Sequence, residues 1–138
     1  MTAAADGALE VRVYYEDTDA GGVVYYGNYA RFFERARSEY MRRAGFDHRR
    51  LREEWGVLFV VRTIRMEYLR PAFLDDVLLV DARPRGRGRV FADFAQTASR
   101  GGEVLATAET RVVCVSGMPL RAAALPPPLA GTIDRHVG

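Results

Sequence analysis

Hydrophobic and polar positions change their spacing along the chain, and these changes predict its elements. Between residues 9 and 15 they alternate, with Leu9, Val11, Val13 and Tyr15 on one face, which is typical of a half-buried strand. Between residues 29 and 44, apolar residues recur every three or four positions, and charged residues such as Arg37 fill the other positions. This spacing predicts an amphipathic helix of about 16 residues, or about 24 Å.

The flanks of this helix carry residues that favour helix ends. Asn28 is expected to cap the N-terminus, and Gly45 is expected to follow the last turn. Residues 47–55 can hold one or two further helical turns.

The rest of the chain predicts strands, rich in β-branched and aromatic residues, over 57–69, 77–83, 89–99 and 103–115. The segment "RGG" predicts a hairpin between the last two, and "RPRGRGR" (83–89) is expected to form a turn between strands. From Gly117 onward, "LPPPL" favours an extended segment outside the sheet. One long helix with segregated strands predicts an α+β fold, and a single curved sheet leaves edges that favour an oligomer.

The length and composition predict one soluble domain. A chain of 138 residues normally forms a single core, so we expect one domain over 1–138, with flexible tails at 1–8 and 127–138. No apolar run approaches the roughly 20 residues of a membrane span. The N-terminus does not resemble a secretory signal, and Cys114 has no second cysteine to pair with, so a cytoplasmic location is expected.

The composition also excludes several kinds of chemistry. The formal net charge is +2, which gives no support to nucleic-acid binding. All 20 basic residues are arginine, so no lysine is available as a nucleophile or Schiff base. With two histidines and one cysteine, neither a metal site nor any other bound cofactor is expected. None of the serines lies in a G-x-S-x-G motif, which leaves carboxylates as the leading catalytic candidates.

Three carboxylates crowd into "EDTDAGGVVYYGNY", just before the predicted helix. A helix N-terminus presents free N–H groups that can bind an anion or a polarised carbonyl. A carboxylate beside such donors suffices for acyl transfer. The alternative is that Asp17 or Asp19 only accepts hydrogen bonds in a turn. The unusually apolar loop "GGVVYYG" favours the functional interpretation.

The sequence resembles the hotdog-fold acyl-CoA thioesterases of the 4-hydroxybenzoyl-CoA thioesterase-like family, most closely the branch associated with the Tol–Pal gene cluster. The resemblance rests on "YYEDTDAGGVVYYGNYARFFERARSEYMR", "FVVRTIRMEYLRPAFLDDVL" and "ETRVVCV", and spans about residues 10–126. It implies an antiparallel sheet of about five strands wrapped around one central helix. It also implies a homodimer, usually paired into a tetramer, with the active site between subunits.

The resemblance implies a role for several residues. Asp19 would be the catalytic carboxylate, acting as a nucleophile or as a general base. The backbone N–H of Tyr26 would bind the thioester carbonyl, and Val24 and Tyr29 would contact the acyl group. Many members of this branch have histidine where Tyr26 stands, which bears on substrate preference. Coenzyme A would be part of the substrate, and no separate cofactor is implied.

Other candidates have competing interpretations. In "RPRGRGR", Arg85, Arg87 and Arg89 could bind the phosphates of coenzyme A, or could form a solvated basic turn. Glu34 is expected to form an ion pair on the helix surface. His48 lies outside the loop in which a hotdog-fold dehydratase would need a catalytic histidine, so dehydration is not expected. A non-catalytic acyl-CoA-binding or protein-interaction module on the same fold is the alternative function.

Overall fold

The computed structural model describes residues 2–3 and 7–137 of the chain. Its elements, in chain order, are β1 (Thr2–Ala3), β2 (Leu9–Arg12), a 3₁₀ turn (Tyr15–Asp17), α1 (Asn28–Arg43), α2 (His48–Arg50), a π-helical turn (Leu51–Trp55), β3 (Leu58–Tyr68), β4 (Val77–Val80), β5 (Arg83–Arg87), β6 (Phe91–Arg100), β7 (Glu103–Ser116), β8 (Arg121–Ala122) and α3 (Pro127–His136).

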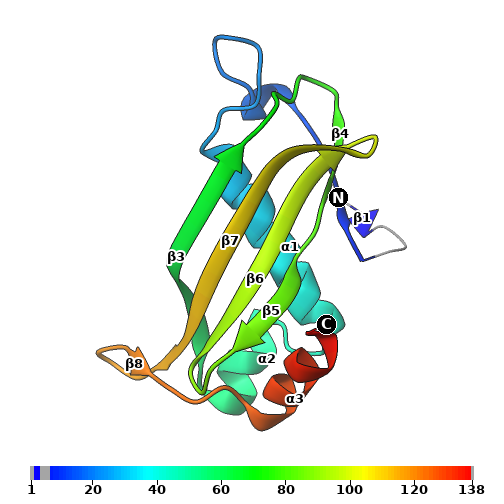
Figure 1. The fold of residues 1–138 in the computed structure, drawn as a ribbon. Coiled ribbons are helices and arrows are strands. Elements are labelled where there is room, and N and C mark those ends of the chain that lie inside the picture. Colours follow the sequence, from blue (N-terminus) through cyan, green and yellow to red (C-terminus); the bar gives the residue numbers. More distant parts are fainter. Residues whose placement is uncertain (1, 4–6, 138) are drawn as a thin grey trace.

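A curled antiparallel sheet wraps around the long helix α1 (Figure 1). The strands follow the order β1-β2-β4-β6-β7-β3, with β5 paired to β6 and β8 paired to β7. Alternate residues of β6 and β7 point toward the helix, where they meet buried α1 residues such as Phe32 and Phe33. The predicted α+β fold, a sheet around one central helix, is confirmed.

The long helix and the strands predicted over 9–15, 57–69, 77–83, 89–99 and 103–115 are present, with shifts at their ends. The strand expected over 9–15 ends at Arg12, because a 3₁₀ turn begins at Tyr15. Tyr15 is therefore 83% exposed, not on the buried face. Helix α1 begins at Asn28 with Gly27 as its N-cap, so the prediction of Asn28 as the cap was wrong. Gly45 follows α1 with a φ of 88°, as expected for a C′ glycine.

The segment 83–89 is not a free turn. Residues Arg83–Arg87 form β5, which pairs with β6, and a bulge at Arg85 shifts the register between Pro84 and Gly86. Figure 1 shows β5 beside α3 at the end of the molecule opposite the loop that precedes α1. Proline is compatible with this strand because β5 lies at a margin of the sheet, where, among the residues that the structure describes, it pairs with β6 alone.

Residues Pro127–His136 form the helix α3, which corrects the expectation of a flexible tail over 127–138. The expectation of an extended segment outside the sheet from Gly117 onward was also wrong, because "LPPPL" runs into α3 and Arg121–Ala122 join the sheet as β8. Prolines at the start of α3 are compatible with a helix, since the first turn needs no intrahelical N–H. Leu129 and Ile133 of α3 are buried in the core. The Tyr40 hydroxyl and His136 Nδ1 lie 2.7 Å apart, which joins α3 to α1.

The N-terminal segment also differs in part from the expected tail. Thr2–Ala3 pair with β2, and Ala8 is buried. Residues 1, 4–6 and 138 of the expected tails lie outside the described part of the chain. None of the helices in the described ranges has the length and apolar character needed to span a bilayer.

Replacing Leu129 by alanine is expected to lower the free energy of unfolding by about 2–5 kcal/mol, because it leaves a cavity where α3 packs. Chemical denaturation of the full chain measures the change. Leu74→Ala is the matched control, since Leu74 is 47% exposed and its truncation is expected to change stability little. Equal, small effects of the two substitutions would show that α3 does not contribute to the core.

Candidate active site

The loop between β2 and α1 is fixed by the backbone and side chain of Asp17. Its carboxylate accepts a hydrogen bond from the Tyr14 N–H at 2.9 Å. Its carbonyl accepts from the Tyr25 N–H and from the Asn28 side-chain amide, both at 2.9 Å. Asp17 is buried, with 8% exposure. This residue therefore ties the end of the strand to the start of the helix.

Asp19 lies in the next turn with an exposed carboxylate. Its Oδ1 accepts a hydrogen bond from the Gly21 N–H at 2.8 Å, and its carbonyl accepts from the Gly22 N–H at 3.0 Å. Gly22 has a φ of 81°, a conformation that glycine adopts without strain. The turn holds the Asp19 carboxylate in one place and leaves its other oxygen free of partners among the described residues.

The loop is also held from its other side by the segment before β4. Val24 is buried and donates its N–H to the carbonyl of Ala72 at 2.8 Å, while Val23 forms an isolated bridge with Phe73. Asp76 fixes that segment by accepting from the Phe73 N–H at 2.8 Å and from Arg100 at 2.7 Å. Desolvation of the Asp76 carboxylate acts to raise its pKa. The two hydrogen bonds and the charge of Arg100 outweigh this effect, so the pKa of Asp76 is lowered.

The start of α1 offers a backbone donor. The Tyr26 N–H, one residue before the N-cap Gly27, has no acceptor among the described residues. The Tyr26 side chain is 62% exposed and its ring lies edge-on to Tyr68, with centroids 6.1 Å apart. The pKa of Tyr25 is raised, first by the neighbouring Tyr26 phenol and also by the negative charge of Asp19. Asp19 and Tyr26 thus belong to one end of α1.

Tyr29, in the first turn of α1, is 4% exposed and its hydroxyl has no hydrogen-bond partner within the described part of the chain. Burial raises the pKa of this phenol. Tyr29 therefore brings an unpaired polar atom to the same end of the helix as Asp19, Val24 and Tyr26.

The predicted arginines lie at the other end of the molecule. Arg87 makes a bidentate pair with Asp134 of α3, at 2.9 and 2.8 Å. For Arg85 and Arg89 the structure gives no side-chain hydrogen bond or ion pair within the described residues. Figure 1 places β5 far along α1 from the loop of Asp19, so one chain does not bring the two predicted groups together.

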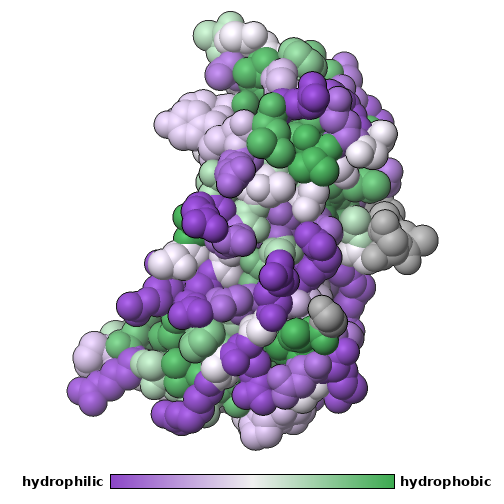
Figure 2. Space-filling model, in the orientation of Figure 1, coloured by the Kyte–Doolittle hydropathy of each residue, from purple (hydrophilic) through white to green (hydrophobic). Residues whose placement is uncertain are grey.

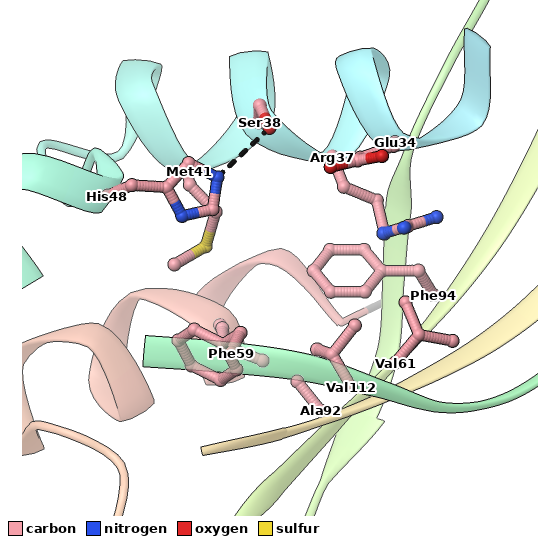
Figure 3. A pocket seen from close by; sticks show the side chains of 11 residues that line it. Glu34, Arg37, Ser38, Met41, His48, Phe59, Val61, Ala92, Phe94 and Val112 are labelled. Atoms are coloured by element: carbon pink, nitrogen blue, oxygen red, sulfur yellow. Dashed lines mark hydrogen bonds between the residues drawn. The ribbon is translucent and has the colours of Figure 1, made fainter. Parts of the chain in front are cut away.

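Sequence reasoning missed a second polar group, which faces a cavity between α1 and the sheet. Arg37 was expected on the solvent side of the helix but is 8% exposed and bonds to Gln96 at 2.8 Å. The prediction of a surface ion pair for Glu34 was wrong, because the described residues give it no such partner. Ser38 Oγ lies 3.1 Å from His48 Nε2 (Figure 3). The signal in the sequence was the position of Arg37, four residues from both Phe33 and Met41.

The two neighbouring aspartates are expected to differ in their effect on folding. Asp17→Asn weakens the buried hydrogen bond to the Tyr14 N–H and should lower the unfolding free energy by about 1–3 kcal/mol. Asp19→Asn should change stability little, since Asp19 is exposed and an amide oxygen can still accept from the Gly21 N–H. Denaturation curves of the two variants measure this, and a larger loss for Asp19→Asn would contradict the assignment of Asp17 as the structural residue.

Known proteins resemble this chain over most of its length. The family model of the thioesterase superfamily matches residues 21–112. The "Acyl-CoA thioesterase YbgC" of Haemophilus influenzae is 43% identical over 119 residues, covering 86% of this chain and 88% of that protein. The "Acyl-CoA thioester hydrolase YbgC" of Escherichia coli O6:H1 is 45% identical over 119 residues, covering 84% and 87%.

A solved structure agrees with these sequence matches. The probable thioesterase from Bartonella henselae has a TM-score of 0.82 and 32% identity, with 86% of this chain and 98% of that chain covered. The hotdog fold and the enzyme class implied by the sequence are confirmed by this agreement. The chain belongs to the thioesterase superfamily.

Proposed function

We propose that the chain hydrolyses acyl-CoA thioesters where the Asp19 loop meets the start of α1. The proposal rests on the presence of two groups at the same end of α1: the fixed, exposed carboxylate of Asp19 and the free backbone N–H of Tyr26. The relatives named as acyl-CoA thioesterases support the same substrate class. In the proposed complex, the thioester carbonyl accepts a hydrogen bond from the Tyr26 N–H, and the helix dipole stabilises the oxyanion that forms.

Two routes through Asp19 lead to the same products. As a general base, Asp19 takes a proton from water while the water oxygen attacks the carbonyl carbon; the C–S bond then breaks and the thiolate of coenzyme A takes up the proton. As a nucleophile, Asp19 forms a mixed anhydride and expels the thiolate, and water then hydrolyses the anhydride. A single turnover in ¹⁸O-water separates them, because only the second route can carry the label into the carboxylate of Asp19.

Asp19→Asn is expected to lower kcat by at least about 10²-fold, because the amide can neither attack nor take a proton. The measurement is thiol release from a panel of aliphatic and aromatic acyl-CoAs. Glu16→Gln is the matched control, since Glu16 is an exposed acid of the same loop to which no role is given. Near-normal turnover by Asp19→Asn would overturn the proposed role of Asp19. No thiol release by the unaltered chain from any thioester would favour a non-catalytic module.

Arg85 and Arg89 remain the candidates for the phosphates of coenzyme A, because Arg87 is already engaged by Asp134. The ion pair raises the pKa of Arg87, first through the hydrogen bonds that its guanidinium donates to Asp134. An unpaired guanidinium can bind phosphate through two parallel N–H donors without giving up an existing partner.

Arg85→Ala is therefore expected to raise KM for an acyl-CoA roughly tenfold and to leave kcat nearly unchanged, as for a contact equal in the ground and transition states. A short acyl thioester of pantetheine, which lacks the nucleotide phosphates, is the internal control and should show no such change. A fall in kcat on both substrates would argue against a phosphate contact.

We further propose that the active enzyme is a dimer in which two β3 strands pair, and that dimers can associate again into a tetramer. Within the described part of the chain, β3 pairs with β7 alone and its other edge is open. Leu58, Val60, Val61, Ile64 and Tyr68 on this strand are 37–48% exposed. An open, apolar edge strand favours pairing with another strand.

The apolar surface extends beyond the edge. Met118 and Leu120, beside β8, are 97% and 53% exposed. Figure 2 shows hydrophobic side chains gathered at lower left, over the ends of β7 and β8 and the start of β3. This patch lies next to the open edge and supports contact with further copies of the chain.

A further inference from the structure

A cavity of about 220 Å³ lies between the second half of α1 and the sheet (Figure 3). Its floor is apolar and includes Phe59 and Val61 of β3 and Phe94 of β6, and Ile133 of α3 forms part of the wall. For comparison, an apolar cavity of about 150 Å³ holds benzene. This cavity therefore fits a ring or a chain of about six carbons with a small substituent.

The roof of the cavity is polar, although it belongs to the helix face that meets the sheet. Glu34, Arg37 and Ser38 are three and four residues apart, which places them on one side of α1. His48 lies beside Ser38, with His48 Nε2 and Ser38 Oγ 3.1 Å apart. Figure 3 shows the Arg37 side chain extending from α1 toward Phe94.

The guanidinium of Arg37 is buried and has no carboxylate partner among the described residues. It is 8% exposed, and its hydrogen bond goes to the neutral side-chain amide of Gln96 at 2.8 Å. Within the described residues, no carboxylate lies within ion-pair distance of it. Burial lowers the pKa of Arg37, and only the field of Glu34 opposes this. An unpaired buried charge is costly, and a guanidinium has five N–H donors, so an anion in the cavity would complement Arg37.

The cavity is too far from Asp19 of the same chain to share a small acyl group with it. Ser38 follows Asn28 by ten residues, which is about 15 Å along the helix. In the proposed dimer, antiparallel pairing of two β3 strands places the start of one α1 beside the second half of the other. The cavity then faces the Asp19 loop of the second copy.

We propose that this cavity binds the acyl group of the thioester that the second copy cleaves, and that it selects a compact acyl group with a carboxylate at its far end. Arg37 binds that carboxylate, and Ser38 and His48 add hydrogen-bond donors at the rim. The inference rests on the proposed function, whose substrate class it narrows to coenzyme A thioesters of dicarboxylic acids of about six carbons.

The first test compares kcat/KM for adipoyl-CoA and hexanoyl-CoA, which differ in the terminal carboxylate. The unaltered enzyme should prefer adipoyl-CoA by about tenfold or more, as a charged hydrogen bond allows. Arg37→Gln, Ser38→Ala and His48→Gln should each reduce this preference. Since Arg37→Gln can also disturb folding, the Ser38 and His48 variants provide an independent readout.

Glu34 allows a test of charge rather than packing, because a change in its charge alone should alter the preference for adipoyl-CoA. Glu34→Gln removes a negative charge near Arg37 and should strengthen the preference for adipoyl-CoA. Glu39→Gln, on the side of α1 where Glu39 pairs with Arg42 at 3.4 Å, should leave it unchanged. Equal hydrolysis of both thioesters, or a preference only for 4-hydroxybenzoyl-CoA over benzoyl-CoA, would overturn the carboxylate assignment.

The second test is complementation between two defective chains. Asp19→Asn removes the acid, and Val61→Phe fills the cavity from β3. When the two variants are mixed equally and exchange subunits, half of the dimers contain one chain of each kind. Each of these dimers has one intact site of two, with the acid from the Val61→Phe chain and the cavity from the Asp19→Asn chain. The mixture should therefore show about a quarter of full activity. No recovery would show that the acid and the cavity act within one chain. Full activity of Val61→Phe alone would exclude the cavity, whereas full activity of Asp19→Asn would instead refute the proposed function.

Discussion

The arrangement of the loop depends on the hydrogen bonds of one buried residue, Asp17. Its carboxylate binds the backbone at Tyr14, and its carbonyl binds both the backbone of Tyr25 and the side chain of Asn28. These bonds fix where β2 ends and α1 begins, and therefore the position of the free Tyr26 N–H just before the helix. Because a buried acceptor that loses its donor is costly, the loop has little freedom to adopt another path. Asp19 can then remain exposed while its position is set by neighbours.

The helix α1 serves two polar regions that its amphipathic pattern does not reveal. Its N-terminal end carries the loop and the unpaired Tyr29 hydroxyl, whereas its second half places Arg37 above an apolar floor. Core packing alone would favour apolar residues at both Tyr29 and Arg37. Polar groups at core positions reduce stability unless they are bonded, so their presence indicates a role beyond packing.

Much of the fold could be predicted from the sequence, because periodicity reports which face of an element is buried. The long helix, the hairpin at Gly101–Gly102 and the strands β2, β3, β4, β6 and β7 were predicted in this way, whereas β1, β5 and β8 were not. The errors share a physical cause, since they depend on distant contacts. Arg37 is buried because Gln96 lies across from it, and residues 127–136 are helical because Leu129 and Ile133 find apolar partners in the core. The spacing of Arg37 from Phe33 and Met41 indicates the buried face of the helix, but only the distant Gln96 explains why an arginine can occupy it.

The candidate site was predictable at its loop, where spacing and composition were unusual. The cavity was not, because its walls come from α1, β3, β6, β7 and α3, which only the folded chain brings together.

The C-terminal helix has a further consequence. Ile133 contributes to the cavity wall, while the loop of Asp19 is held by residues up to Asn28, by the segment 71–76 and by Arg100. The acid and the cavity are thus encoded in separate stretches of the gene. Substitutions at or next to Ile133 in α3 can resize the cavity while the hydrogen bonds around Asp19 stay intact, so new selectivities can evolve on this fold with the same catalytic residues.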